Sequence, residues 1–230
     1  MGVTRSIGRQ LAPRVVPRVT QLAPGLSASF VREALHRAID GAGPFAAATK
    51  VAERLLDSND GDADEAIDDV IDQHIRYAGV QGFATNLGGL VTMTVAVPAN
   101  ITGLAVLQDR MVAAIAHLRG YDLTDPRVHN AILVATIGED DVHHLVKRGK
   151  LPAPPMALAT APVHDPSIDA LVSAEVAGDL ITRVAGKRLA TTMGRRIPVI
   201  GGIVGMGTDG WSTYKIGHYA AGEFLPRRPR

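Results

Sequence analysis

The chain of 230 residues contains no cysteine, and aromatic residues make up only 4% of it. Without cysteine, the protein can form neither disulfides nor a thiolate nucleophile, and it has no thiolate ligands for zinc or iron–sulfur clusters. With so few aromatic side chains, the core must be built mainly from Ala, Val, Leu, Ile and Gly. Such residues favour close approach of backbones over packing around large aromatic anchors.

The chain also lacks a large excess of charge of either sign, because its formal net charge is +1. It is therefore not predicted to bind nucleic acid. Basic residues nevertheless gather at the two ends of the chain. We expect these arginines to contact anionic lipid or an acidic partner, although solvated, frayed termini explain them as well. They are Arg5, Arg9, Arg14, Arg18, Arg227, Arg228 and Arg230.

No segment shows the alternation of a β-strand, whereas apolar residues recur at helical spacing through most of the chain. The sequence therefore predicts an all-α protein with one helical domain over residues 26–225. A basic arm that contains prolines, residues 1–25, precedes this domain, and a basic tail, residues 226–230, follows it. Closely packed, glycine-rich central helices, arranged as a helical hairpin, are expected to form the core.

Several residues predict where helices begin and end. Asp125-Pro126 and Asp165-Pro166 suit helix starts, because Asp can cap the helix and Pro fits its first turn. Glycines at four positions suit helix ends: Gly41, Gly138, Gly149 and Gly186. Residues 150–165 are rich in proline and alanine and are predicted to be a linker. A last helix is expected to continue to Phe224.

Residues 77–108 contain no Asp, Glu, Lys or Arg. The run is long enough to span a membrane, which takes about 20 apolar residues. Gly88, Gly89 and Pro98 interrupt it, so a buried core helix, a kinked interfacial helix and a weak membrane span all remain open. A second uncharged run, residues 197–208, is too short to span a bilayer as a helix.

Small residues form a stripe at intervals of four in the last helix. This spacing lets another backbone approach closely, in a membrane or in a tightly packed soluble core. The stripe predicts a surface for helix packing or membrane packing, with ordinary close packing inside a soluble bundle as the alternative. Its positions are Gly201, Gly205, Asp209, Thr213, Gly217 and Ala221.

Two acids, Asp109 and Asp209, are flanked by small residues on their helices. A buried acid needs a charged or hydrogen-bonding partner. The pair is interpreted as a polar site for a ligand, a cation or a proton, or else as a structural clamp between helices. The candidate partners are Arg110, His117, Tyr214, Lys215 and His218.

No motif for catalysis or cofactor binding is present, since the sequence has no phosphate-binding glycine loop, no HExxH and no GxSxG. His143 and His144 each follow an acid by four residues, a spacing that can chelate a metal. We favour an acidic helix start here, because a metal site needs further ligands. No cofactor and no metal are predicted.

Two blocks of sequence resemble the EcsC family of bacterial proteins. The first contains Pro98-Ala99-Asn100-Ile101 and residues 111–116, followed by Gly120-Tyr121. The second contains residues 197–202, Asp209, Ile216-Gly217 and Phe224. Many family members have an acid where this chain has Asn100, so a role that rests on this acid is in doubt here. The resemblance implies a link to membrane processes, without an established activity.

These observations predict a cytoplasmic protein that associates peripherally with membranes by binding lipid or a membrane protein. One alternative is an enzyme of the hydrolase type that uses the paired carboxyls of Asp109 and Asp209, with or without a metal. Another is a scaffold or interaction protein that forms homo-oligomers through its glycine-rich face.

Overall fold

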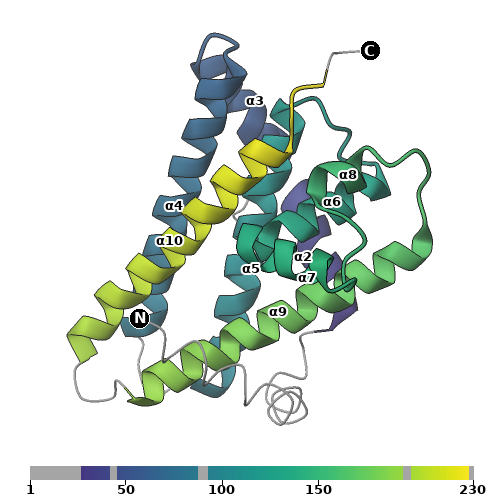
Figure 1. Ribbon diagram of the computed structural model, residues 1–230. Coiled ribbons are helices and arrows are strands. Elements are labelled where there is room, and N and C mark those ends of the chain that lie inside the picture. Colours follow the sequence, from purple (N-terminus) through teal and green to yellow (C-terminus); the bar gives the residue numbers. More distant parts are fainter. Residues whose placement is uncertain (1–26, 42–45, 88–92, 194–197, 228–230) are drawn as a thin grey trace.

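A computed structural model describes residues 27–41, 46–87, 93–193 and 198–227 (Figure 1). It describes the side chains of residues 27–41, 46–80, 103–183 and 207–227. Helices account for most of this part of the chain, and it contains no strand. The predicted all-α, single-domain fold is thus confirmed.

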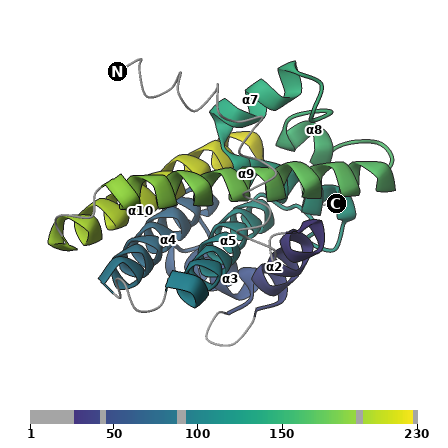
Figure 2. The ribbon, with the colours of Figure 1, turned by 90° about the horizontal axis from the view of Figure 1, so that it is seen from below.

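The helices are α2 (Ala28–Asp40), α3 (Ala48–Ser58), α4 (Ala63–Leu87), α5 (Met93–Leu118), α6 (Pro126–Ile137), α7 (Glu139–Lys147), α8 (Pro155–Ala159), α9 (Pro166–Met193) and α10 (Pro198–Glu223). Helix α5 is central, since it contacts α2, α3, α4, α6 and α10. Helix α10 lies along α4, whereas α9 crosses the bundle and packs on α2 and α6 (Figures 1 and 2).

Most helix ends follow the predicted local signals. Asp125 caps α6 by accepting a hydrogen bond from the backbone N–H of Arg127 at 2.8 Å. Asp165 does the same for α9, accepting from the N–H of Ser167 at 2.9 Å. Gly138 follows the end of α6 with φ of 89°, in the left-handed region that favours glycine. Short-range capping chemistry therefore sets these boundaries.

Two predicted boundaries are wrong. Helix α9 does not stop at Gly186 but continues to Met193. A glycine inside a helix costs only about 1 kcal/mol relative to alanine, which tertiary packing readily offsets. The predicted linker over residues 150–165 contains the short helix α8, where Pro155 fits the first turn and Leu158 is buried.

The uncharged run over residues 77–108 is not one helix, because α4 ends at Leu87 and α5 begins at Met93. Pro98 lies within α5. Among the described residues, no helix combines the length and the apolar character needed to cross a membrane.

Helix α10 packs closely against α4 and α5 at Gly217. A Cβ atom on this residue would lie 2.9 Å from Cγ1 of Ile71 and 3.3 Å from the sulfur of Met111. Contacts below about 3 Å do not occur for real Cβ atoms, so only glycine fits without a shift of the helices. Of the other stripe positions, Asp209 and Thr213 are buried and Ala221 is half-buried. The surroundings of Gly201 and Gly205 lie outside the described side chains.

Candidate functional site

Contacts between α4, α5 and α10 show which of their residues lie at the same height along the bundle. Gly210 of α10 lies against Ile75 of α4, where a Cβ atom on the glycine would be 3.7 Å from Cγ2 of the isoleucine. The amide of Gln108 on α5 donates a hydrogen bond to the hydroxyl of Thr213 on α10 at 3.3 Å. Residues near position 75 of α4, 108 of α5 and 210 of α10 therefore share one level.

On each of these three helices, the stretch without charged residues begins or ends at this level. The uncharged part of α4 starts at Tyr77, that of α5 ends at Gln108, and that of α10 ends at Thr208. On α9, Arg183 marks the same level, because it lines one cavity together with Gln108. The coincidence could not be read from the sequence, since it depends on how the helices are aligned against one another.

We call the helix segments beyond this level the acid-free end: residues 77–87 of α4, 93–108 of α5, 184–193 of α9 and 198–208 of α10. These segments converge at the lower end of the molecule in Figure 1, the end that faces the viewer in Figure 2. Lys187 and Arg188 are their only charged residues. This end is thus weakly basic and otherwise apolar or neutral.

Exposed aromatic side chains lie at the edge of the acid-free end. Trp211 on α10 is 63% exposed and Tyr77 on α4 is 46% exposed. The rings of Trp211 and Tyr214 stack at 5.3 Å, and that of His218 meets Tyr214 at 4.2 Å. Val80, one turn further along α4, is exposed as well. Exposed tryptophan and tyrosine between an apolar and a charged region are typical of membrane interfaces.

Arg227, the last residue that the structure describes, lies at the opposite end of the molecule. The N–H of Arg227 donates a hydrogen bond to the carbonyl of Arg119 at 2.9 Å, and its guanidinium lies 5.1 Å from the ring centre of Tyr121. Arg119 in turn pairs with Asp64 at 2.7 Å, next to the acidic start of α4. The other terminal arginines, Arg5, Arg9, Arg14, Arg18, Arg228 and Arg230, lie outside the described residues.

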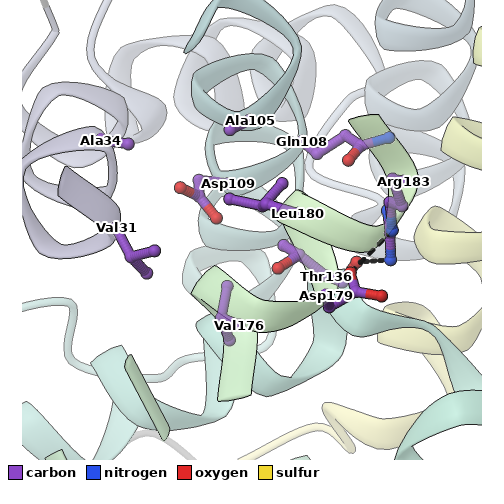
Figure 3. A pocket seen from close by; sticks show the side chains of 10 residues that line it. All are labelled: Val31, Ala34, Ala105, Gln108, Asp109, Thr136, Val176, Asp179, Leu180 and Arg183. Carbon is purple, nitrogen blue, oxygen red and sulfur yellow. Dashed lines mark hydrogen bonds and ion pairs between the residues drawn. The ribbon is translucent and has the colours of Figure 1, made fainter. Parts of the chain in front are cut away.

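Asp109 lies beside a small cavity between α2, α5, α6 and α9 (Figure 3). The centre of a water molecule can move through about 10 Å³ of this cavity, which is room for a single water. The Asp109 residue is only 4% exposed, and its carboxyl forms no hydrogen bond or ion pair with any described residue. Burial raises its pKa to about 8, so at neutral pH the neutral acid predominates in the folded protein.

The second acid of the cavity, Asp179 on α9, has a partner. Arg183 pairs with its carboxylate at 2.7 Å and donates hydrogen bonds to the carbonyls of Thr136 and Ile137, at 3.0 and 2.7 Å. Burial raises the pKa of Asp179 to about 6, although the nearby Arg183 opposes this shift. Figure 3 shows this pair and Asp109 on opposite sides of Leu180. Arg183 thus also caps the last carbonyls of α6.

Asp109 and Asp209 are both buried, but no hydrogen bond or ion pair joins them. Three of the residues predicted as their partners contact other side chains. Arg110 donates a hydrogen bond to the ring of His74 at 3.2 Å, His117 lies 3.7 Å from Glu53, and Lys215 bridges to Asp140 at 3.3 Å. Tyr214 and His218 belong to the exposed aromatic group. The side chain of Asn100 lies outside the described part.

His143 and His144 are exposed on α7. Within the described residues, no three His, Asp or Glu side chains are grouped so that they could hold a metal ion.

No protein-family model matches this chain, nor does any curated protein or solved structure.

Sequence reasoning missed a polar cluster that joins α2, α6 and α9. The guanidinium of Arg32 donates to Ser173 at 2.7 Å and to Asn130 at 2.6 Å. Asn130 and His164 both bond to the carboxylate of Asp169, at 2.7 and 3.0 Å. These residues are far apart in the chain, so no local spacing could reveal the cluster. Only the Asp179–Arg183 pair left a local signal, namely opposite charges four residues apart.

Proposed function

We propose that this protein is a peripheral membrane protein that binds anionic lipid surfaces and inserts its acid-free end into one leaflet. The observation that carries the proposal is the shared level at which charge begins on α4, α5 and α10. A surface that faces only water has no reason to exclude every acid from four neighbouring helix ends, whereas an anionic lipid surface repels acids and attracts lysine and arginine. The resemblance to the EcsC family is in line with this proposal.

The lengths of two of these helix segments suit insertion into a single leaflet. At 1.5 Å per residue, the eleven residues 198–208 of α10 extend about 16 Å, and residues 77–87 of α4 extend equally far. One leaflet contributes about 15 Å of the hydrocarbon core. The stacked rings of Trp211 and Tyr214 follow directly after this length of α10, at the depth where the headgroups of the lipid would lie.

A flotation assay with purified, detergent-free protein tests the proposal. We expect the protein to float with phosphatidylserine-containing vesicles and to bind phosphatidylcholine vesicles more weakly. Because insertion of apolar surface resists salt while surface attraction does not, part of the binding should survive 1 M NaCl. Protein that stays at the bottom of the gradient with both kinds of vesicle would overturn the proposal.

Matched charge variants separate the two ends of the molecule. The double variant Lys187→Gln/Arg188→Gln removes the two basic residues of the acid-free end, and Arg227→Gln removes a basic residue at the opposite end. We expect the double variant to lose about tenfold or more in affinity for anionic vesicles, since each basic residue near the surface contributes about 1 kcal/mol. Arg227→Gln should bind like the unmodified protein. The reverse order would place the lipid-binding surface at the C-terminus.

A further inference from the structure

The buried carboxyl of Asp109 lies under helix α2. Val31 and Ala34 of α2 form one wall of its cavity, with Ala105 of α5 and Leu180 of α9 beside them (Figure 3). Ala34 and Ala38 also touch Val106 of α5, in a small apolar cluster separate from the main core. The contact between this half of α2 and α5 is therefore made by small side chains, with an ionisable group at its edge.

Among the described side chains of the surrounding helices, the positive charges are engaged with groups other than Asp109. On α2, Arg32 is turned toward Asn130, Asp169 and Ser173. On α9, Arg183 is bonded to Asp179 and to two carbonyls of α6.

Helices α4, α5 and α6 offer Asp109 no counter-charge either. Arg110 of α5 is bonded to His74 of α4, and the amide of Gln108 is bonded to Thr213 of α10. Helix α6 contributes Thr136, whose hydroxyl donates to the carbonyl of Leu133 at 2.8 Å. An ionised Asp109 would thus be a buried charge without compensation, which strongly disfavours the closed arrangement of these helices.

We propose that Asp109 is a proton-binding site that locks α2 onto α5, so that binding of the proton docks the helix and loss of the proton releases it. The cavity leaves room for a water molecule to accept a hydrogen bond from the neutral acid. When the proton leaves, outward movement of α2 would open the charge to bulk water, because α2 forms the wall on the side of the carboxyl. The inference does not depend on the proposed membrane function.

Hydrogen exchange of the α2 amides tests this inference. The docked state holds the proton up to about pH 8, whereas the open state releases it near the usual value of about 4. Between these values, the population of the open state should rise about tenfold per pH unit, and it should level off above pH 8. We therefore expect the protection factors of residues 34–40, corrected for the intrinsic exchange rate, to fall about tenfold from pH 6.5 to 7.5.

Asp109→Asn is the decisive variant, since the amide has nearly the same shape and cannot ionise. Its α2 amides should keep constant protection across this pH range. His36 of α2 and His129 of α6, whose ring centres lie 5.6 Å apart, are both retained in the variant, so the difference between the two proteins isolates Asp109. Equal pH dependence in the two proteins would overturn the inference.

Two further measurements keep the inference testable if the variant folds poorly. A carbon-13 NMR titration of the unmodified protein follows the Asp109 carboxyl directly, and a midpoint near pH 4 would refute the assignment. Exchange at pH 9 in sodium chloride and in choline chloride distinguishes a proton from a metal cation. Equal exchange in the two salts supports the proton, whereas protection restored by sodium would make a metal cation the ligand instead.

Discussion

The two ends of this helical bundle differ in how many charged residues they contain. At the end where α3 leads into α4, charged side chains are frequent and have defined roles. Asp62 caps α4 through the backbone N–H groups of Asp64 and Glu65, and Arg119 pairs with Asp64. At the acid-free end, Lys187 and Arg188 are the only charged residues of the four helix segments. The first end is rich in charged side chains, and the second has the composition on which the proposed contact with lipid rests.

The boundary between these two regions explains why Asp109 matters. It is the first charged residue after the uncharged part of α5, yet it is buried and has no described ion-pair partner. Gln108 and Arg110, its neighbours in the chain, both have polar partners on adjacent helices. At this boundary, the polar side chains that face α4 and α10 have hydrogen-bond partners. The carboxyl of Asp109, which faces α2, has no described partner.

The largest effect on the free energy of unfolding is expected from Asp109→Asn, which replaces the buried ionisable carboxyl with a neutral amide. The pKa of Asp109 is about 8 in the folded protein and near 4 in the unfolded chain. Since the folded state holds the proton more tightly, stability is lost as the pH rises from 4 to 8. The variant should therefore be more stable by on the order of 5 kcal/mol at pH 8 and about equal at pH 4. Urea denaturation at both pH values measures this, and an equal midpoint at pH 8 would contradict it.

Breaking the satisfied pair on the other side of Leu180 should have the opposite effect. Arg183→Gln leaves Asp179 without its partner and two carbonyls of α6 without their donor. We expect a loss of about 2–3 kcal/mol in the free energy of unfolding at pH 8. The pKa of Asp179 is about 6, and a protonated carboxyl needs no counter-charge. Without Arg183 the pKa of Asp179 rises further, so the defect should shrink as the pH falls from 8 toward 6, and a defect that is constant with pH would argue against this account.

The alignment of the helices at the boundary can be disturbed at Gly217. Gly217→Ala adds a Cβ atom 2.9 Å from Ile71, which should push α10 away from α4 and cost about 1–3 kcal/mol. Gly222→Ala is the matched control in the same helix, because its Cβ atom would meet nothing within 4 Å. This control should gain about 0.5–1 kcal/mol from the higher helix propensity of alanine. Thermal unfolding of the two variants side by side shows whether they differ in sign.

The smallest effect on stability, with a clear effect on binding, is expected at the exposed aromatic edge. Trp211→Glu should change the free energy of unfolding by less than about 0.5 kcal/mol, because the side chain is 63% exposed. It should lower the affinity for anionic vesicles at least about tenfold, since it removes an interfacial anchor and adds an acid.

Leu225→Glu is the control for this variant at the other end of the molecule, where the side chain is 52% exposed. It should leave vesicle binding within about twofold. Equal losses for the two variants would mean that the ends of the molecule do not differ in their contact with lipid.

The sequence predicted the fold class because its evidence is local. Helical periodicity and the caps at Asp125 and Asp165 act within one or two turns of a helix. The same local rules failed at Gly186 and in residues 150–165, where packing outweighs the preference of single residues. Gly217 was recognised as a packing position from its spacing, but its contact atoms on Ile71 and Met111 come from two other helices.

The arrangement of the candidate sites could not be predicted, for a physical reason. Similar small flanking residues suggested that Asp109 and Asp209 share one site, yet the direction of a side chain depends on which helices pack around it. Asp109 faces a cavity under α2, and α2 is distant from it in the chain. The shared level of charge on α4, α5 and α10 likewise depends on contacts such as Gly210 with Ile75.

Trp211 allows the most direct test of the central claim, because it is the only tryptophan in the chain and lies at the edge of the acid-free end. Its fluorescence can be recorded with anionic vesicles whose lipids carry bromine at defined depths of the acyl chain. The account predicts a shift of the emission to shorter wavelength and strongest quenching by bromine near the headgroups. Unchanged emission and no quenching at any depth would contradict insertion of this end into the membrane.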